Sequence, residues 1–302
     1  MLFTNSTRLV TKATDFSYDE MVTRNAGFVT PAEQQMLRHG RVFVCGVGGM
    51  GGAALQSLVR AGVGHFALAD LDVFETSNLN RQLFATTETL GHPKVAATCA
   101  AMTRINPDVA LTTYGAEWID HLDEILPVHR VVINGMDDLA AGIALYRKAR
   151  EHGATVIDAY TAPLPSVTVV GPLDPRPEER LGFPTVGTDW RKLIPAQIDA
   201  CKIAEAIYVM VHSSSAHHID VALAADLVAG RTTRPSFAPM VIETGTLMAF
   251  EAVKLLLGRD SGVDHRGVFL NPWTMEVERP RTAPVAWVRE RIARRFLARM
   301  MA

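Results

Sequence analysis

The chain is poor in cysteine, has no excess of charge of either sign and contains no long apolar run. Its 302 residues include three cysteines, and no two of them form the Cys-x-x-Cys pair that commonly begins a zinc site. The 30 lysines and arginines nearly cancel the 32 aspartates and glutamates, so the overall charge favours neither nucleic acid nor an anionic membrane as a partner. We therefore expect no disulfide framework, no structural zinc and no nucleic-acid partner.

Signals for export and membrane insertion are missing as well. The N-terminus has no basic region followed by an apolar core, and no apolar run reaches the roughly 18 residues of a membrane span. Apolar residues nevertheless make up 48% of the chain, which is enough for a sizeable buried core. These features predict a globular, cytoplasmic protein without a membrane partner.

Short runs rich in β-branched residues alternate with helical patterns along the first half of the chain. Helical spacing covers 49–61, 93–105 and 138–152. This alternation predicts a parallel sheet with crossover helices, an α/β fold of the Rossmann-like, doubly wound type. The expected strands are 41–46, 65–70, 109–114, 130–135 and 154–160.

The pattern changes after Tyr160. A strand is expected at about 166–171, followed by a stretch dense in proline and charge that we interpret as an ordered loop over a site, or as a hinge. A terminal helix at 287–301 has one apolar face and five arginines largely elsewhere, which favours packing on its own domain or a dimer mate over a membrane surface. Further helices are expected at 195–212, 216–229 and 239–257.

A glycine-rich loop joins the first predicted strand to the first predicted helix. In "RVFVCGVGGMGGAALQSLVRAG", Gly46, Gly48 and Gly51 form G-x-G-x-x-G, with Gly49 between them. Glycines there let the backbone turn tightly and approach a phosphate, while free N–H groups at the helix start face the anion. Asp70 ends the next strand, where a carboxylate accepts hydrogen bonds from ribose hydroxyls. The loop predicts a nucleotide site, and NAD, FAD and ATP all suit it.

A cluster of polar side chains follows the second predicted strand. Asn78, Arg81, Gln82 and Lys94 lie in "SNLNRQLF" and "GHPKV". An oxidoreductase needs only the ribose acid and a lined nicotinamide slot. Cleavage of ATP between its α- and β-phosphates does need cations on the triphosphate, because charge develops on the leaving pyrophosphate. The cluster therefore favours ATP.

Taken together, the motifs resemble those of the ThiF/MoeB/HesA, ubiquitin-activating-like family of ATP-dependent adenylyltransferases. The resemblance covers roughly residues 20–160, and "RPSFAPMVIETGTLMAFEAVKLLLG" is similar to a later helix of the family. It implies a ThiF/MoeB adenylation domain whose mainly parallel sheet continues into an antiparallel C-terminal extension. The motifs, in the order and at the spacing of the family, are "GVGGMGG", "LADLD", "SNLNRQ", "GHPKV", "TRINP" and "NGMDD".

The resemblance implies roles for individual residues around ATP and magnesium. Asp70 is expected to hold the ribose, with Asp72 nearby. Asp137 is expected close to the α-phosphate and its Mg²⁺, an ion that prefers oxygen ligands. Asp138 is either a neighbour in that site or a cap of the following helix. The implied phosphate site consists of Asn78, Arg81 and Lys94, with Gln82 in support, and the glycines Gly46, Gly48, Gly49 and Gly51.

A homodimer is implied as well. Arg24 matches the N-terminal arginine that dimers of the family supply to the ATP of the partner subunit. On this basis 1–35 is predicted to be an arm and helix at the dimer contact, and 36–171 the nucleotide-binding core. Residues 172–302 are predicted to form the substrate-side loop and the C-terminal helices and strands of the same domain.

The implied chemistry is the activation of a carboxylate. The carboxylate attacks the α-phosphate in line, which gives an acyl adenylate and pyrophosphate, and the enzyme contributes positioning and charge stabilisation. The substrate is expected to be a protein or peptide C-terminus, an acidic side chain in a peptide, or a small acid. An NAD(P)-dependent oxidoreductase and a non-catalytic nucleotide-binding scaffold are the two alternatives.

The chain also departs from parts of the family. Ubiquitin-type activators carry a catalytic cysteine after the core, and the candidate here, Cys201, lies on one face of a predicted helix, which favours a buried, inert thiol. Cys45 and Cys99 are expected in the core. The histidines of "HSSSAHHID" favour a polar loop and helix cap over a metal site. A thioester step is therefore not expected.

Overall fold

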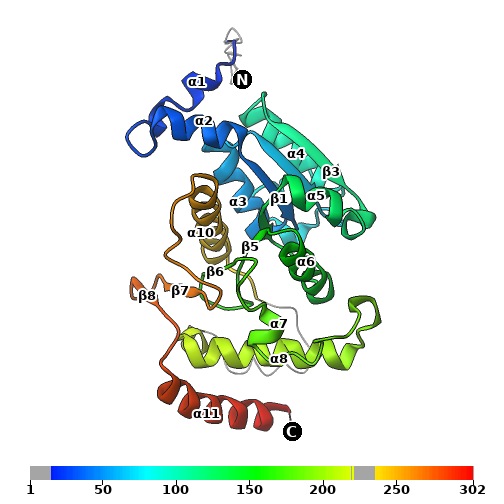
Figure 1. The fold of residues 1–302 in the computed structure, drawn as a ribbon, viewed down its shortest axis with the longest axis vertical. Coiled ribbons are helices and arrows are strands. Elements are labelled where there is room, and N and C mark those ends of the chain that lie inside the picture. The colour runs from blue at the N-terminus through cyan, green and yellow to red at the C-terminus, as the bar shows by residue number, and fades with distance from the viewer. Residues whose placement is uncertain (1–14, 219, 221–234, 302) are drawn as a thin grey trace, which may run out of the picture.

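The protein is built around one eight-stranded sheet with helices on both faces (Figure 1). The computed structural model describes residues 15–218, 220 and 235–301. The strands follow the order β3-β2-β1-β4-β5-β6-β7-β8, in which β1 to β5 are parallel and β6, β7 and β8 are each antiparallel to their neighbours. The strands are β1 (Arg41–Cys45), β2 (His65–Ala69), β3 (Ala110–Tyr114), β4 (Val131–Asn134), β5 (Thr155–Asp158), β6 (Ser166–Val170), β7 (Val268–Asn271) and β8 (Glu276–Glu278).

The helices cover the two faces of this sheet and extend beyond its β6–β8 end. In Figure 1, α8 and α11 lie side by side at the end of the molecule opposite α1 and α2. Among the described residues, no helix combines the length and apolar character needed to cross a membrane. The helices are α1 (Tyr18–Met21), α2 (Pro31–His39), α3 (Gly49–Arg60), α4 (Lys94–Ile105), α5 (Leu122–Val128), α6 (Leu139–Glu151), α7 (Pro177–Arg180), α8 (Pro195–His212), α10 (Ala238–Leu256) and α11 (Ala283–Met301).

Alternation along β1 divides the core into two layers. Val42 and Val44 point into the layer that α3 and α10 complete, and Phe43 and Cys45 point into the layer that α5 and α6 complete. Successive side chains of a strand face opposite sides of the sheet, so a strand covered on both sides is apolar throughout. This explains why the predicted strand runs are continuous rather than alternating in polarity.

The predicted fold class is confirmed, and the expected strands and crossover helices are present. Two expected helices need correction. The terminal helix begins at Ala283, four residues before the expected start, because Pro284 suits the first turn of a helix. Of the helix expected at 216–229, the structure describes a short 3₁₀ helix over Ser215–His218, and 221–229 lie outside the described residues. Residues 1–14 of the predicted N-terminal arm also lie outside them.

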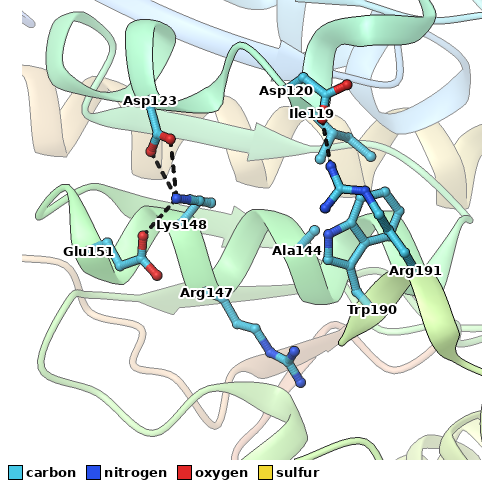
Figure 2. A pocket seen from close by; sticks show the side chains of 9 residues that line it. All are labelled: Ile119, Asp120, Asp123, Ala144, Arg147, Lys148, Glu151, Trp190 and Arg191. Atoms are coloured by element: carbon cyan, nitrogen blue, oxygen red, sulfur yellow. Dashed lines mark hydrogen bonds and ion pairs between the residues drawn. The ribbon is translucent and has the colours of Figure 1, made fainter. Parts of the chain in front are cut away.

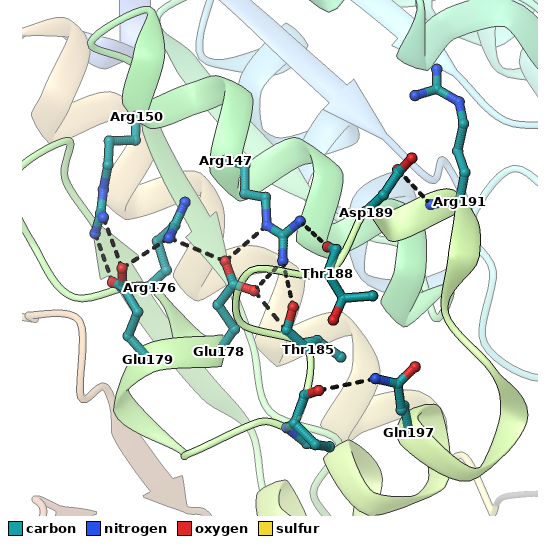
Figure 3. A network of polar contacts seen from close by, with 11 residues as sticks. Arg147, Arg150, Arg176, Glu178, Glu179, Thr185, Thr188, Asp189, Arg191 and Gln197 are labelled. Atoms are coloured by element: carbon teal, nitrogen blue, oxygen red, sulfur yellow. Dashed lines mark hydrogen bonds and ion pairs between the residues drawn. The ribbon is translucent and has the colours of Figure 1, made fainter.

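Charged side chains of α6 link it to two neighbouring segments. Towards α5, Lys148 donates to Asp123, and its second ion-pair partner, Glu151, lies on α6 itself (Figure 2). Towards the proline-rich stretch, Arg147 binds the carboxylate of Glu178 through Nε and Nη2, at 3.0 and 2.7 Å (Figure 3). These ion pairs join α6 to the chain on both of its sides.

The proline-rich stretch is an ordered segment held on α6. Arg147 also donates to the carbonyl oxygens of Thr185 and Thr188, and Arg150 forms an ion pair with Glu179 (Figure 3). Glu178 is only 2% exposed, and a buried carboxylate needs such partners because burial removes it from water. We call this set of contacts the α6 latch.

Candidate functional site

The glycine loop turns the chain sharply between β1 and α3. Gly46 has φ +82°, a left-handed conformation that favours glycine, and its N–H donates to the carbonyl oxygen of Ala69 at 2.7 Å. A Cβ atom on Gly51 would overlap the carbonyl oxygen of Gly46, so the first turn of α3 packs directly on the loop. Gly48 occupies the N-cap of α3 and supplies no side-chain cap. Amide groups at the helix start are thereby left for an anionic group.

Asp70 connects this loop to the end of β2. Its Oδ2 accepts the Val47 N–H at 2.8 Å, and its Oδ1 accepts the Asp72 N–H at 2.9 Å. The carboxylate is partly buried and stabilises the glycine loop directly. Its contact with a ribose remains a prediction, and such a contact would use the lone pairs that these two hydrogen bonds leave.

Lys94 lies at the first position of α4, almost out of solvent. Its side chain is 8% exposed, and its Nζ binds the Oδ2 of Asp72 at 2.7 Å. Asp72 is by contrast largely exposed, so the ammonium group is held at the edge of the site by a carboxylate that faces water. Lysine is seldom this buried unless it is paired. The structure thus brings two predicted site residues, Lys94 and Asp72, into direct contact.

The 3₁₀ turn Thr76–Asn78 carries the remaining polar cluster. Asn78 is buried, and its Oδ1 accepts the Glu75 N–H at 3.0 Å, so its amide stabilises the turn. The guanidinium group of Arg81 is partly exposed and donates to the Ser77 carbonyl oxygen and the Asn80 side chain. These two residues were predicted as phosphate contacts. Here they share a polar turn beside β2.

Gln82, which was predicted to support the phosphate site, has a buried side-chain amide. Its Oε1 has no hydrogen-bond partner among the residues that the structure describes. A Cβ atom on Gly48 would lie 3.5 Å from Gln82 Nε2, so the amide lies against the glycine loop. A buried polar atom without a partner is rare and indicates a place where a ligand or water completes the structure.

Helix α10 closes over the same loop, a contact that the sequence analysis did not predict. A Cβ atom on Gly49 would lie 2.6 Å from Cγ1 of Val241, in the first turn of α10. Just before that helix, the Ser236 carbonyl oxygen accepts the Asn80 side-chain amide at 2.8 Å. No local pattern signals these contacts, because the partners are far apart in the chain.

Asp137 follows β4 and reaches the surface. It is exposed, and no described residue forms a hydrogen bond or ion pair with it. Its turn touches the glycine loop, because a Cβ atom on Gly135 would overlap the carbonyl oxygen of Gly46. Asp138 instead caps α6, where its Oδ1 accepts the Ala141 N–H at 3.1 Å. The helix-cap interpretation of Asp138 is therefore confirmed.

A buried polar relay lies behind this turn, and the sequence analysis did not find it. Asp158, at the end of β5, accepts hydrogen bonds from Asn134 Nδ2 at 2.9 Å and from the Tyr146 hydroxyl at 2.7 Å. Asn134 in turn accepts the Met136 N–H through Oδ1, at 3.3 Å. Burial raises the pKa of Asp158 to about 6, although these hydrogen bonds favour its charged form. The relay fixes the turn that leads to Asp137.

Arg24 lies apart from these residues. Its turn packs against the C-terminal end of α3, where Asn25 Nδ2 donates to the Ala61 carbonyl oxygen at 3.1 Å. The glycine loop is at the other end of that helix, and a 12-residue helix is about 18 Å long. Arg24 is exposed, and the structure does not bring it to the glycine loop of its own chain.

Burial raises the pKa of all three cysteine thiols. Burial raises the pKa of the Cys201 thiol to about 11, which disfavours a thiolate. One described group could offer three ligands to a metal ion: Asp123, Glu151 and His152. Lys148 already lies between the first two, beside a cavity of about 320 Å³ between α5 and α6 (Figure 2).

Comparison with known proteins identifies the kind of fold that carries this site. The model of the ThiF family matches residues 22–286. The molybdopterin-synthase adenylyltransferase of Escherichia coli (strain K12) is 41% identical over 108 residues, which are 35% of this chain and 43% of that protein. The match thus spans less than half of that relative's length.

Solved structures share the fold at low sequence identity. E. coli MccB, solved with AMPCPP and MccA, has a TM-score of 0.60 and 15% identity, over 88% of this chain and 74% of that one. E. coli tRNA N6-threonylcarbamoyladenosine dehydratase, TcdA, in complex with ATP, has a TM-score of 0.57 and 16% identity, over 80% of this chain and 95% of that one.

Proposed function

The chain belongs to the ThiF family, and from that premise we propose that it uses ATP and Mg²⁺ to adenylate a carboxylate. The observation that carries the proposal is the convergence of the glycine loop, the Lys94–Asp72 pair and the Asp137 turn at one edge of the sheet. Ligands of open α/β sheets bind at the carboxyl ends of the strands, where these groups lie. Adenylation is also the activity named for the curated relative.

The residues present fit a triphosphate. The start of α3 has amide groups without a side-chain cap, and the side-chain amide of Gln82 lies against Gly48 with its donor atom Nε2 nearest to the loop. Arg81 lies beside Gly49, and Lys94 is connected to the glycine loop through its ion pair with Asp72, whose N–H donates to the same Asp70 carboxylate that accepts from the loop. A bound triphosphate would give the amide groups of α3 and the guanidinium group of Arg81 an anionic partner, and it would share Lys94 with Asp72.

Asp137 suits magnesium. Its carboxylate is exposed and pairs with no described residue, and Mg²⁺ binds through one or two carboxylates together with phosphate oxygens and waters. When bound, the ion neutralises charge on the phosphates. The relay from Tyr146 through Asp158 and Asn134 would hold the turn of Asp137 in place for that contact.

The reaction requires positioning and charge stabilisation from this chain. A carboxylate oxygen of the substrate forms a bond to the α-phosphorus, and the bond to the β-phosphate bridging oxygen breaks, giving an acyl adenylate and pyrophosphate. Lys94 and Arg81 would stabilise the charge that develops on the pyrophosphate. Because Cys201 is buried, we propose that the acyl group passes to a small or intramolecular nucleophile and not through a thioester.

We propose a homodimer in which Arg24 of each subunit reaches the ATP of the other. Arg24 lies at the far end of α3 from its own glycine loop, so it can assist a reaction only at another copy. The substrate is a peptide, a carrier protein or a small acid. MccB, which shares the fold, was solved with AMPCPP and MccA.

Pyrophosphate exchange into ATP, in the presence of pools of candidate carboxylates, tests this function. Asp137→Asn should abolish carboxylate-dependent exchange, because it removes the charge proposed to hold Mg²⁺. Asp138→Asn is the matched control, since asparagine caps a helix about as well as aspartate and exchange should persist. ATP binding without exchange in any pool would favour a scaffold, and binding of NAD(P) in place of ATP would favour an oxidoreductase.

A further inference from the structure

Helix α11 has two apolar faces, and its own fold covers one of them. Ala293 and Leu297 are buried against Ile207 and Val211 of α8. In Figure 1 the two helices lie side by side along their length. This contact fixes α11 on the molecule and determines which of its sides faces outward.

The outward side carries a stripe of large apolar residues. Val285, Val288, Ile292 and Phe296 follow the spacing that aligns side chains along one face of a helix. All four are exposed, and Ile292 is 62% exposed. We call these four residues the α11 stripe. Contiguous exposed apolar side chains of this kind mark interaction surfaces.

Arginines surround the α11 stripe, and several lack a carboxylate. The helix contains five arginines and one glutamate. Arg294 binds Glu290 at 2.7 Å, and Arg289 donates to backbone carbonyl oxygens at the end of α8. Arg295 and Arg299 are exposed and form no ion pair with any described residue. The stripe thus combines apolar contact area with uncompensated positive charge.

We propose that the α11 stripe binds an acidic amphipathic helix of a partner protein or peptide. An apolar face of such a helix would cover Val288 and Ile292, and its acidic flanks would pair with Arg295 and Arg299. This proposal concerns a partner surface and stands independently of adenylation. Binding can therefore be measured without ATP.

The arginines of α11 favour this partner over a second copy of the helix and over a lipid bilayer. A second copy of α11 would place arginines against arginines, which opposes self-association. A bilayer would have to accommodate Arg299, which stands seven residues after Ile292 and so lies in line with the stripe. An acidic helix can pair with that guanidinium group instead.

Binding to two synthetic fluorescent peptides tests the proposal on the full chain. The peptides share one leucine face and differ in their flanks, which are glutamate in one and lysine in the other. The glutamate peptide should bind at least about tenfold more tightly, measured by fluorescence anisotropy. Val288→Ser/Ile292→Ser and Arg295→Glu/Arg299→Glu should each weaken that binding by about tenfold or more.

Matched controls change the same residue types elsewhere. Leu173→Ser removes a 98% exposed apolar side chain, and Arg104→Glu reverses an exposed charge on α4; both should bind like the unmodified chain. Circular dichroism checks that each variant is folded. Equal binding of both peptides, or unchanged binding by the stripe variants, would overturn the proposal.

Two further results would also overturn it. The first is binding to phosphatidylglycerol vesicles but not to the glutamate peptide, which would assign the stripe to a membrane surface. The second is a dimer in sedimentation that the stripe variants dissociate, which would assign it to a second copy of the chain.

Discussion

The Lys94 side chain is almost fully buried, and its ammonium group pairs with the exposed carboxylate of Asp72. Lys94→Ala should lower kcat/KM of adenylation about a hundredfold or more. That loss corresponds to about 3 kcal/mol, the scale seen when one preorganised electrostatic donor is removed. Initial rates of pyrophosphate exchange measure the effect. Lys148→Ala, which removes a surface lysine with two carboxylate partners on α5 and α6, should leave the rate unchanged.

Asp158 makes the free energy of unfolding depend on pH. Its pKa rises from 3.8 to about 6 in the folded chain, so the folded state holds a proton that the unfolded state releases. The protonated Asp158 carboxyl group therefore contributes fully to the stability of the folded state below about pH 4, and this stabilisation is lost as the pH rises through 6. Compared with the unmodified chain, Asp158→Asn should therefore be more destabilised at pH 4 than at pH 7, by on the order of 2 kcal/mol.

Urea denaturation of both chains at the two pH values measures this difference. All other titrating groups are common to the pair, so they cancel in the comparison. A penalty that is independent of pH would show that Asp158 is ionised throughout this range and that the relay does not shift its proton affinity.

Individual residues differ in how far the sequence could predict them. Lys94 and Arg81 stand in motifs whose residue types and spacing indicate phosphate chemistry, and Asp138 matches the position of a helix cap. Asn134 and Asp158 gave no such signal, because their hydrogen bond depends on the pairing of β4 with β5. The unpartnered Gln82 amide likewise becomes visible only once burial is known.

At the scale of elements, the close packing of the glycine loop on α3 limits what can replace its glycines. Gly51→Ala should disrupt the loop, because a Cβ atom there would overlap the Gly46 carbonyl oxygen, and backbone cannot move aside as a side chain does. A loss of ATP binding, measured by calorimetry, should accompany a lower midpoint of thermal unfolding.

Gly142→Ala is the matched control for that substitution. Gly142 lies within α6, and a Cβ atom there would meet only Asn134 Nδ2, at an ordinary contact distance of 3.6 Å. Alanine suits a helix interior better than glycine, so stability should be unchanged or rise by up to about 1 kcal/mol. Unimpaired ATP binding by Gly51→Ala would contradict the role given to the loop.

The order of elements was the most predictable part of the fold. Apolar runs separated by helical patterns indicated β1 to β5 and the helices α3, α4 and α6, since periodicity is a local property. Helix α5, between β3 and β4, was not predicted. The short strands β7 and β8 were not located, because three or four residues give too little pattern. The α6 latch was also missed, as its arginines and glutamates pair only after α6 and α7 meet.

For the whole molecule, the position of Arg24 predicts a site shared between two subunits. Arg24→Ala and Asp137→Asn should each be inactive alone. Equal mixtures that exchange subunits should recover about one quarter of the full activity, because half the dimers are mixed and each contains one intact site. Pyrophosphate exchange before and after mixing measures the recovery. No recovery, despite subunit exchange shown by mass spectrometry, would contradict a shared site.

The packing of α10 against the glycine loop was the least predictable feature at this scale. Val241 of α10 contacts Gly49 of the glycine loop, and Ser236, just before α10, contacts Asn80. Both contacts join residues that are more than 150 positions apart in the chain. The sequence predicted that α10 exists, and the helix boundaries agree within one residue. Its contact with the loop depends on how α10 packs along α3, which no local pattern records.

In the proposed reaction, a carboxylate attacks the α-phosphate of ATP at the glycine loop. The most direct test uses the carboxylate identified by pyrophosphate exchange, labelled with oxygen-18, and follows the label into released AMP by mass spectrometry. We expect one labelled oxygen in AMP, because the bond between the carboxylate oxygen and phosphorus survives when the acyl group is transferred. Unlabelled AMP, or release of ADP and phosphate in its place, would contradict it.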